Sequence, residues 1–390
     1  MIPYGKHHVD EEDIQAVADL LRTGWLTQGP MVGAFEDAVK EYVGAKYAVA
    51  VSSGTAALHI AALAAEVGPG DGLITSPITF VASANAAIYS GATPIFCDID
   101  PETVNVSASG LQQVVDAHPE ARAVIPVHYS GLPCEMEAIA KVAKKSGLRV
   151  IEDAAHALGS TYDDGSRVGS CKYSDMTMFS FHPVKAIAAG EGGMITTNDA
   201  ELYKRLLRLR SHGINKGDDP FQILEQAEAN GERNPWYYEM QQIGFNYRIT
   251  DIQCALALSQ FKKIDRFVAR RKKLAKAYDV AFQEFENAKP AQAMKRDQSG
   301  HHLYVLRVDF GAIGMSRAQL MLALRDRGVG TQVHYVPVPA HPFYRDRGYK
   351  LEDFPHAEKF YEEALTIPLF YDLTDEQQHF IVTTFAELVG

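Results

Sequence analysis

One lysine, Lys185, stands apart in the stretch FSFHPVKAIAAGEGG (residues 179–193), between an apolar, strand-like run and a series of small residues. The next acidic residue in the chain is Glu191. An amine among apolar neighbours loses the hydration of its charged form, so its pKa falls and more of it is a free nucleophile. The stretch therefore indicates a lysine that reacts with a carbonyl group.

A second segment, SSGTAALHI (residues 52–60), changes from a strand pattern to a helix pattern at Ser-Gly-Thr. The first N–H groups of a helix lack partners within it, and the helix dipole favours an anion there. Gly54 would let the backbone approach a phosphate, and Thr55 could add a hydroxyl. Simple N-capping by Ser53 or Thr55 is the alternative. Neither a Walker loop nor a GxGxxG fingerprint occurs in the chain.

A third segment, LRVIEDAAHALGS (residues 148–160), runs from an apolar strand into Glu152 and Asp153. Consecutive strand residues face opposite ways, so at most one of these acids points into a site at the strand end. A carboxylate there can keep a heteroaromatic nitrogen protonated, and His156 could reach the same ligand. The alternatives are a helix N-cap for Asp153 and a satisfied, partly buried side chain for His156.

A pyridoxal phosphate enzyme needs three parts: an anion-binding site, a carboxylate at a strand end and an isolated lysine. The lysine bonds to the aldehyde of the cofactor, the cofactor withdraws electrons, and the carboxylate keeps its ring electron-poor. Each part has an ordinary structural explanation, but the three in one chain favour pyridoxal phosphate as cofactor.

Short apolar runs alternate with helical patterns over the first part of the chain, which predicts a mostly parallel sheet covered on both faces. After residue 260 the pattern changes to one long amphipathic helix over 261–288, a strand in HHLYVLRVDF, a helix after Ser316 and a C-terminal helix. We therefore expect a large α/β domain over 1–250 and a smaller α+β domain over 251–390. Residues 215–240 are irregular and are expected to be either a lid or disordered.

The composition is that of an ordinary globular protein, with 46% hydrophobic residues among 390 and a net charge of −11. The acidic balance disfavours nucleic acid and anionic membranes as partners. The four cysteines are far apart, which favours reduced, buried thiols over disulfides. With a polar N-terminus, no long apolar run and no predicted metal site, the expected location is the cytoplasm.

Over nearly its whole length the chain resembles the DegT/DnrJ/EryC1/StrS nucleotide-sugar aminotransferases, pyridoxal phosphate enzymes of the aspartate aminotransferase fold (fold type I). The motifs that carry the resemblance are WLTQGP (25–30), SSGTAAL (52–58), PITFVASAN (77–85), EDAAHALGS (152–160), FSFHPVKAIAAGEGG (179–193), RSHG (210–213) and GFNYRITDIQ (244–253). A narrower resemblance, in FHPVK, RSHG, HHLYVL (301–306) and QVHYVPV (332–338), is to the subgroup that aminates a UDP-linked 4-keto-6-deoxy-N-acetyl sugar on the route to pseudaminic acid.

The resemblance implies a role for each matching residue. Lys185 would carry the cofactor and act as the base that moves the proton during transamination. Asp153 would hold the pyridine nitrogen, and His156 would lie beside the ring hydroxyl. The other implied cofactor contacts are Gly54, Thr55, Ala56 and Ser180 at the phosphate, Phe80 on the ring face, and Asn246 at the phosphate of the neighbouring subunit in a homodimer with shared sites. The implied substrate contacts are Tyr4, Leu26, Thr27, Gln28, Gly29, His334 and Tyr335.

The implied reaction transfers an amino group from L-glutamate to C4 of the keto sugar. Some family members carry histidine in place of the lysine and remove a hydroxyl; here the lysine of SFHxxK favours transamination, although His182 lies three residues earlier. Three alternatives stay open. They are the same chemistry on a GDP- or dTDP-linked sugar at C4 or C3, another pyridoxal phosphate reaction such as a desulfurase or lyase, and a non-catalytic sensor that keeps the fold.

Overall fold

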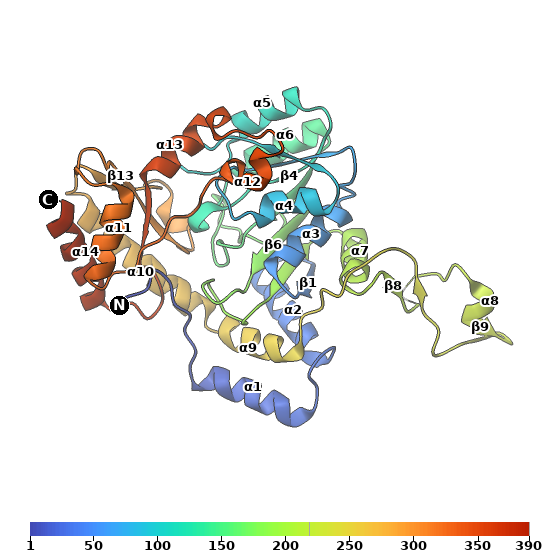
Figure 1. The fold of residues 1–390 in the computed structure, drawn as a ribbon. Helices are drawn as coiled ribbons and strands as arrows, with labels where there is room; N and C mark the ends of the chain where they lie inside the picture. Colours follow the sequence, from blue (N-terminus) through green and yellow to red (C-terminus); the bar gives the residue numbers. More distant parts are fainter. Residues whose placement is uncertain (218, 390) are drawn as a thin grey trace.

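The computed structural model describes residues 1–217 and 219–389 and is built around a seven-stranded sheet (Figure 1). The strand order is β1-β7-β6-β5-β4-β2-β3. Strand β7 is antiparallel to both of its neighbours, and every other neighbouring pair is parallel. The strands are β1 (Tyr47–Val51), β2 (Gly72–Thr75), β3 (Thr93–Phe96), β4 (Ala121–Ile125), β5 (Arg149–Asp153), β6 (Met176–Ser180) and β7 (Gly193–Thr197).

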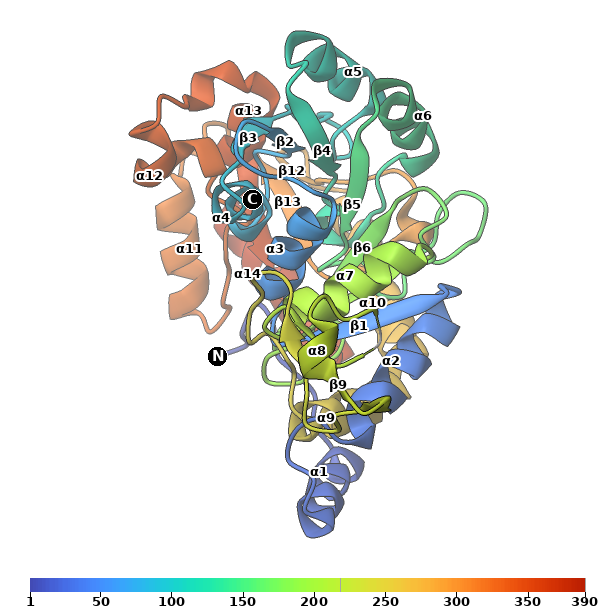
Figure 2. The ribbon, with the colours of Figure 1, turned by 90° about the vertical axis from the view of Figure 1, so that its right-hand side faces the viewer.

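Helices cover both faces of this sheet, as the apolar strand pattern predicted. One face packs against α2 (Pro30–Val43), α5 (Ala108–Ala117), α6 (Met136–Ser146) and α9 (Asp251–Phe261). The other face packs against α3 (Gly54–Ala64), α4 (Ala82–Tyr89) and α7 (Ala200–Arg210), of which α3 and α7 lie across the strands in Figure 2. In β1, Ala48 and Ala50 enter the first core while Val49 and Val51 enter the second, which is the two-residue alternation of a strand buried on both sides.

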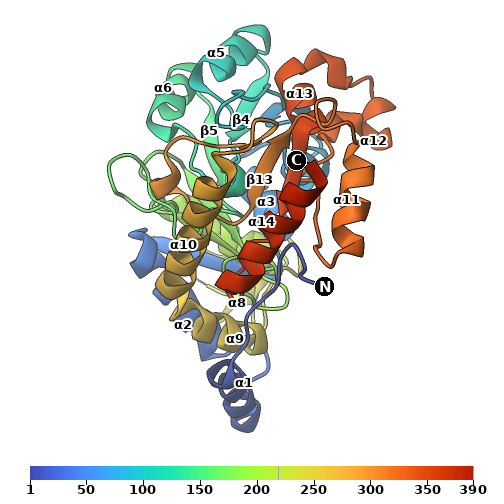
Figure 3. The same ribbon diagram turned by 90° about the vertical axis from the view of Figure 1, so that its left-hand side faces the viewer.

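A second, three-stranded antiparallel sheet follows in the chain, in the order β12-β13-β14. It shares a core with α10, α11 and α14, and Figure 3 shows α10 and α14 side by side. The predicted helix over 261–288 is α10, and the chain turns at Lys262 and Lys263 between α9 and α10. The bounds are β12 (Ala288–Pro290), β13 (Tyr304–Val308), β14 (Ala364–Ile367), α10 (Ile264–Phe282), α11 (Arg317–Asp326), α12 (Pro342–Arg345), α13 (Pro355–Glu363) and α14 (Asp375–Val389).

The N-terminal residues lie away from the large sheet. The N-terminal residues run along the second sheet region, where Ile2 N–H donates to the Gly328 carbonyl and Leu369 N–H to the Tyr4 carbonyl. They then lead into α1 (Glu11–Thr23), which packs on α9. Residues 2–8 thus connect the second sheet region with α1 and its partner α9.

The irregular stretch expected at 215–240 forms an arm that extends away from the sheet (Figure 1). Its base is the pair of short strands β8 (Ile214–Asn215) and β11 (Glu239–Met240), and it carries α8 (Leu224–Ala227), β9 (Glu228–Ala229) and β10 (Glu232–Arg233). Large apolar side chains on and beside the arm are exposed, among them Trp236 at 72% and Ile243 at 72%.

All four cysteines are buried and unpaired, as the sequence predicted. Within the residues that the structure describes, no helix has the length and apolar character required to cross a bilayer.

Candidate active site

A cavity of about 460 Å³ lies where β5 and β6 end and α3 begins. Strands β5 and β6 are parallel, with Asp153 level with Met178, so both strands deliver side chains to the same edge of the sheet. The carboxyl edge of a parallel sheet is the usual ligand site in such folds. Later segments of the chain, which include His302, His334 and Tyr335, close the cavity from the other side.

The start of α3 forms one wall of this cavity through Ser53, Gly54 and Thr55. Ser53 caps the helix, since its Oγ accepts a hydrogen bond from Ala56 N–H at 3.1 Å. A Cβ atom on Gly54 would lie 3.0 Å from the Cβ of Ser180, so glycine permits this close approach of the helix start to the end of β6. The capping alternative is therefore confirmed locally, and the same helix end still faces the cavity.

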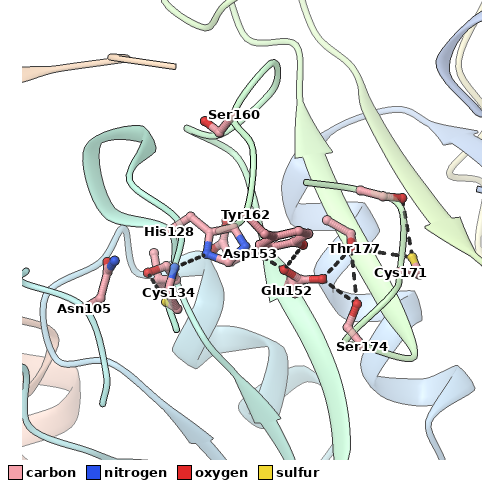
Figure 4. Close-up of polar contacts among 12 residues, drawn as sticks. Asn105, His128, Cys134, Glu152, Asp153, Ser160, Tyr162, Cys171, Ser174 and Thr177 are labelled. Atoms are coloured by element: carbon pink, nitrogen blue, oxygen red, sulfur yellow. Dashed lines mark hydrogen bonds and ion pairs between the residues drawn. The ribbon is translucent and has the colours of Figure 1, made fainter. Parts of the chain in front are cut away.

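The two consecutive acids of β5 point to opposite sides of the strand. Glu152 is fully buried and accepts hydrogen bonds from four side chains, shown in Figure 4. These donors are His128 Nε2 at 2.7 Å, Tyr162 Oη at 2.5 Å, Ser174 Oγ at 2.5 Å and Thr177 Oγ1 at 2.9 Å. Burial by itself would raise the pKa of Glu152, but the His128 contact and the hydroxyl donors bring it below its ordinary value.

Asp153 lines the cavity and has fewer partners. Its Oδ2 accepts from Ser83 Oγ at 2.6 Å, and its Oδ1 accepts from Ala155 N–H at 3.1 Å. Burial raises the pKa of Asp153 despite these two hydrogen bonds. The chain therefore places one carboxylate in a closed polar cluster and offers the other to a ligand.

Lys185 lies in the loop after β6, with its backbone N–H donating to the His182 carbonyl at 2.8 Å. Its side chain lines the cavity, and no hydrogen bond or ion pair links its Nζ to another described residue. Burial lowers the pKa of Lys185 to about 8, with Asp153 partly opposing this shift. Near neutral pH a usable fraction of this amine is thus unprotonated, as required for attack on a carbonyl group.

His156 is held in one tautomer by its two partners. Ser130 N–H donates to Nδ1 at 3.3 Å, so a neutral ring carries its proton on Nε2, which lies 3.0 Å from Tyr335 Oη. Burial and the nearby Lys185 and His334 set the pKa of His156 well below its ordinary value. Since Tyr335 Oη accepts from His156, its own hydrogen is free to donate toward the cavity.

Several other residues that the sequence assigned to the site also line the cavity. Phe80 and Tyr4 line it. The ring of Phe80 lies 6.2 Å from that of Tyr335, and the ring of Tyr4 lies 5.3 Å from that of His334. His334 Nδ1 hydrogen-bonds Thr366 Oγ1 at 2.9 Å, and burial lowers the pKa of His334 to about 3.

Other predicted residues lie away from the cavity lining in this single chain. Ala56 is buried one residue further into α3. The segment Leu26, Thr27, Gln28 and Gly29 is tied to the start of α9, where Gly29 N–H donates to Asp251 Oδ2 at 2.7 Å. Asn246 is exposed and bridges to Ser211 beside the end of α7.

Ser83 and His302 received no role from the sequence, although Ser83 hydrogen-bonds Asp153 and His302 lines the cavity. Ser83 is a polar side chain in the alanine-rich helix α4, and that contrast was the only available signal. His302 belongs to the HHLYVL motif, and its ring packs 4.3 Å from the ring of His156. Nothing in the sequence distinguishes it from its neighbour His301.

The doubly covered sheet, the lysine and the strand-end carboxylate define an α/β enzyme that handles a carbonyl compound. The family model of the DegT/DnrJ/EryC1/StrS aminotransferases matches residues 7–386, and the chain belongs to this family. It is 40% identical over 390 residues to the spore coat polysaccharide biosynthesis protein SpsC of Bacillus subtilis (strain 168), covering 100% of this chain and 97% of SpsC.

Solved structures of sugar aminotransferases have the same fold. The chain is similar to Helicobacter pylori PseC, an aminotransferase involved in the biosynthesis of pseudaminic acid, with a TM-score of 0.88, 30% identity and coverage of 100% and 99% of the two chains. It is also similar to the putative sugar aminotransferase Spr1654 of Streptococcus pneumoniae in its PMP form, with a TM-score of 0.89, 30% identity and coverage of 100% and 99%. Spr1654 has also been solved in a PLP form.

The cofactor is pyridoxal phosphate, as the sequence predicted, and the residues of the cavity suit it. Lys185 would hold its aldehyde carbon and Asp153 its ring nitrogen. Gly54 and Thr55 lie at the start of α3, close to Ser180 at the end of β6, and this helix start suits a phosphate group. The fold class is confirmed with the family.

Proposed function

We propose that this sugar aminotransferase moves the amino group of L-glutamate to C4 of a UDP-linked 4-keto-6-deoxy-N-acetyl sugar, in a route to pseudaminic acid. The observation that carries the reaction type is the pairing of Lys185 and Asp153 in one cavity, the lysine with its pKa lowered to about 8. The structural likeness to PseC and the FHPVK, HHLYVL and QVHYVPV motifs support the sugar.

The bound cofactor supplies an electron sink for the carbon that loses its proton. The chain's own residues then have separate tasks. Asp153 would hold the ring nitrogen in its protonated form, and Lys185 Nζ would take up and return the proton at the reacting carbon. A proton carrier in a fixed position contributes roughly 10²–10⁴ to the rate. The buried cavity limits water around both groups.

The relatives support more than one candidate sugar. SpsC takes its name from spore coat polysaccharide, whereas PseC takes its name from pseudaminic acid. Another nucleotide keto sugar, linked to GDP or dTDP and aminated at C4 or C3, is therefore the alternative. Comparing the turnover of these sugars distinguishes this alternative from our proposal.

We further propose a homodimer with shared active sites, in which Asn246 of one copy reaches the phosphate-binding site of the other. Asn246 is exposed and outside the cavity of its own chain, which is the placement that such a role requires. The exposed Trp236 and Ile243 support a second copy near the arm, since large exposed apolar side chains are candidates for a contact surface. In the same proposal the arm supplies contacts to the nucleotide diphosphate.

The predicted division into a cofactor domain over 1–250 and a small domain over 251–390 stays a proposal. The two separate sheets support it, while α9 packs back onto α1 and α2 across the boundary. A cytoplasmic location is proposed as well. The four buried free cysteines support it, because disulfides are rare in reducing compartments.

A product assay tests the proposed function. Purified protein would be incubated with L-glutamate and, in turn, the UDP 4-keto sugar, GDP- and dTDP-linked 4-keto sugars, and a 3-keto sugar. Products would be identified by mass spectrometry and NMR, and kcat/KM compared. We expect the UDP 4-keto sugar to be preferred; preference for another sugar would remove the specific assignment and leave the aminotransferase intact. Lack of turnover with every sugar and glutamate would contradict the proposed reaction.

A further inference from the structure

His302 is a buried residue of the cavity that none of the roles described above uses. It is 6% exposed and lies two residues before β13, with its backbone N–H donating to the Ser130 carbonyl at 2.9 Å. Its ring lies 4.3 Å from the ring of His156, tilted by 36°, and it is one of the residues that line the cavity. His302 thus adjoins the group expected beside the cofactor ring.

The ring nitrogens of His302 have no hydrogen-bond partner among the described residues. Nδ1 is fully buried and makes no hydrogen bond to any described residue. Nε2 also makes none within the described chain, but it is not among the fully buried atoms, so it is the ring nitrogen that a ligand in the cavity can reach. Buried nitrogens are normally hydrogen-bonded, and each exception requires a reason.

The charge state of His302 decides what it offers to a ligand. Burial, together with His156, Lys185, Arg271 and His334 nearby, sets the pKa of His302 well below its ordinary value, so the ring is neutral and has one N–H. An N–H without a partner is rarer in protein interiors than an acceptor without one. The proton therefore belongs on Nε2, and Nδ1 remains as a buried acceptor.

We propose that His302 is a substrate-binding residue, whose Nε2–H donates a hydrogen bond to an acceptor oxygen of the substrate bound over Lys185. This inference rests on the proposed aminotransferase function, because both substrates of that reaction occupy the cavity in turn. Two oxygens have the required chemistry: the carboxylate of the amino donor and an oxygen of the keto sugar. The experiment distinguishes them.

The charges in the cavity favour the carboxylate of the amino donor. Among the described residues that line the cavity, Lys185 is the sole lysine and there is no arginine, while Asp153 and Glu191 are acidic. A carboxylate held there therefore needs neutral donors in addition to Lys185. Tyr335 Oη–H, which is free because Tyr335 accepts from His156, is a second donor of this kind. Hydrogen bonds to an ionised acceptor are roughly twice as strong as neutral ones.

The experiment compares His302→Leu, which removes the donor, with His302→Gln, which keeps an N–H at the position of Nε2. His301→Asn is the matched control, because His301 is the neighbouring buried histidine, its Nε2 contacts the Arg296 carbonyl, and it does not line the cavity. Each variant is first checked for thermal unfolding and for retained cofactor. Binding of α-methyl-L-glutamate, which has no α hydrogen to lose, is then measured by calorimetry. The glutamate and sugar half-reactions are measured separately by stopped-flow absorbance.

We expect His302→Leu to weaken α-methyl-L-glutamate binding and to slow the glutamate half-reaction by about 10- to 100-fold, with the sugar half-reaction preserved. His302→Gln and His301→Asn should resemble the wild type. A loss confined to the sugar half-reaction would assign the donor to a sugar oxygen and still support the inference. An equal loss in both halves, or no loss in either, would overturn it. A wild-type protein without a glutamate half-reaction would instead refute the proposed function.

Discussion

Glu152 and Asp153 are adjacent in β5, yet their pKa values shift in opposite directions from their ordinary values. The hydroxyl and imidazole donors around Glu152 outweigh its burial, whereas burial outweighs the two donors of Asp153. The strand thereby separates a carboxylate that stabilises the fold from one that faces a ligand.

Replacing Asp153 tests the carboxylate of the cavity. Asp153→Ala should keep part of its cofactor and lose transamination by about 10²-fold or more, because the ring nitrogen loses the anion that keeps it protonated. Steady-state rates and the cofactor absorbance measure the two effects. Asp153→Asn, with the same shape and no charge, should show the same loss of rate. Full activity in both variants would mean that another group supplies the charge.

Replacing Glu152 tests the carboxylate on the other side of the strand. Glu152→Gln leaves fewer acceptors for the four donors and should lower the free energy of unfolding by about 1–3 kcal/mol. Since the pKa of Glu152 in the folded protein lies below its ordinary value of 4.5, its contribution to stability is present above that pH and is lost as pH falls through the folded pKa. Urea denaturation at several pH values should therefore show a weaker acid dependence in the variant. The exposed Glu137→Gln serves as control and should leave the unfolding curve unaltered.

Lys185 should be the residue to which the cofactor attaches. Borohydride reduction followed by peptide mass mapping should label Lys185 in the wild type and no residue in Lys185→Ala, while the exposed Lys141→Ala keeps the label. With a pKa of about 8, the free amine increases as pH rises and levels off above that value. The rate at which cofactor-free protein takes up pyridoxal phosphate should follow this curve. A label on another lysine, or a rate still rising at the ordinary lysine pKa, would contradict the assignment.

A mixing experiment tests the shared site. Asn246→Asp would place a negative charge beside a phosphate and should weaken cofactor binding. Mixed with Lys185→Ala, it should form heterodimers with one intact site, and about a quarter of the wild-type activity should return after full subunit exchange. Lys185→Ala mixed with Asp153→Ala is the control, because both residues serve one chain's cavity and no activity should return. Absence of recovery with Asn246→Asp, despite proven exchange, would place Asn246 in its own chain's site or in a structural role.

The parts of the site that the sequence predicted are local in the chain. Ser53 and Gly54 mark a strand-to-helix change within a few residues, and the alternation of β5 made it clear that only one of Glu152 and Asp153 could face a ligand. The apolar runs likewise predicted the strands of the large sheet. Strand β7 was not predicted, since GMITT combines glycine with threonine and lacks the apolar run of its neighbours.

The contacts that the sequence did not predict join segments far apart in the chain. Ser83 reaches Asp153 from α4, and His302 reaches His156 from the segment between β12 and β13. Such pairs depend on how strands register and how loops close, and a single sequence carries no local sign of either. The residue types of the site were therefore visible in the sequence, but the hydrogen bonds between them were not.

The arm is a place where the chain can change in length without altering the rest of the fold. Because β8 and β11 pair with each other, the chain leaves the body of the protein and returns to it at one place. Insertions or deletions beyond these strands would leave the register of the seven-stranded sheet unaltered, as is usual for exposed excursions whose ends meet. The arm is thus a modular position, at which an engineered segment could be exchanged without rebuilding the catalytic core.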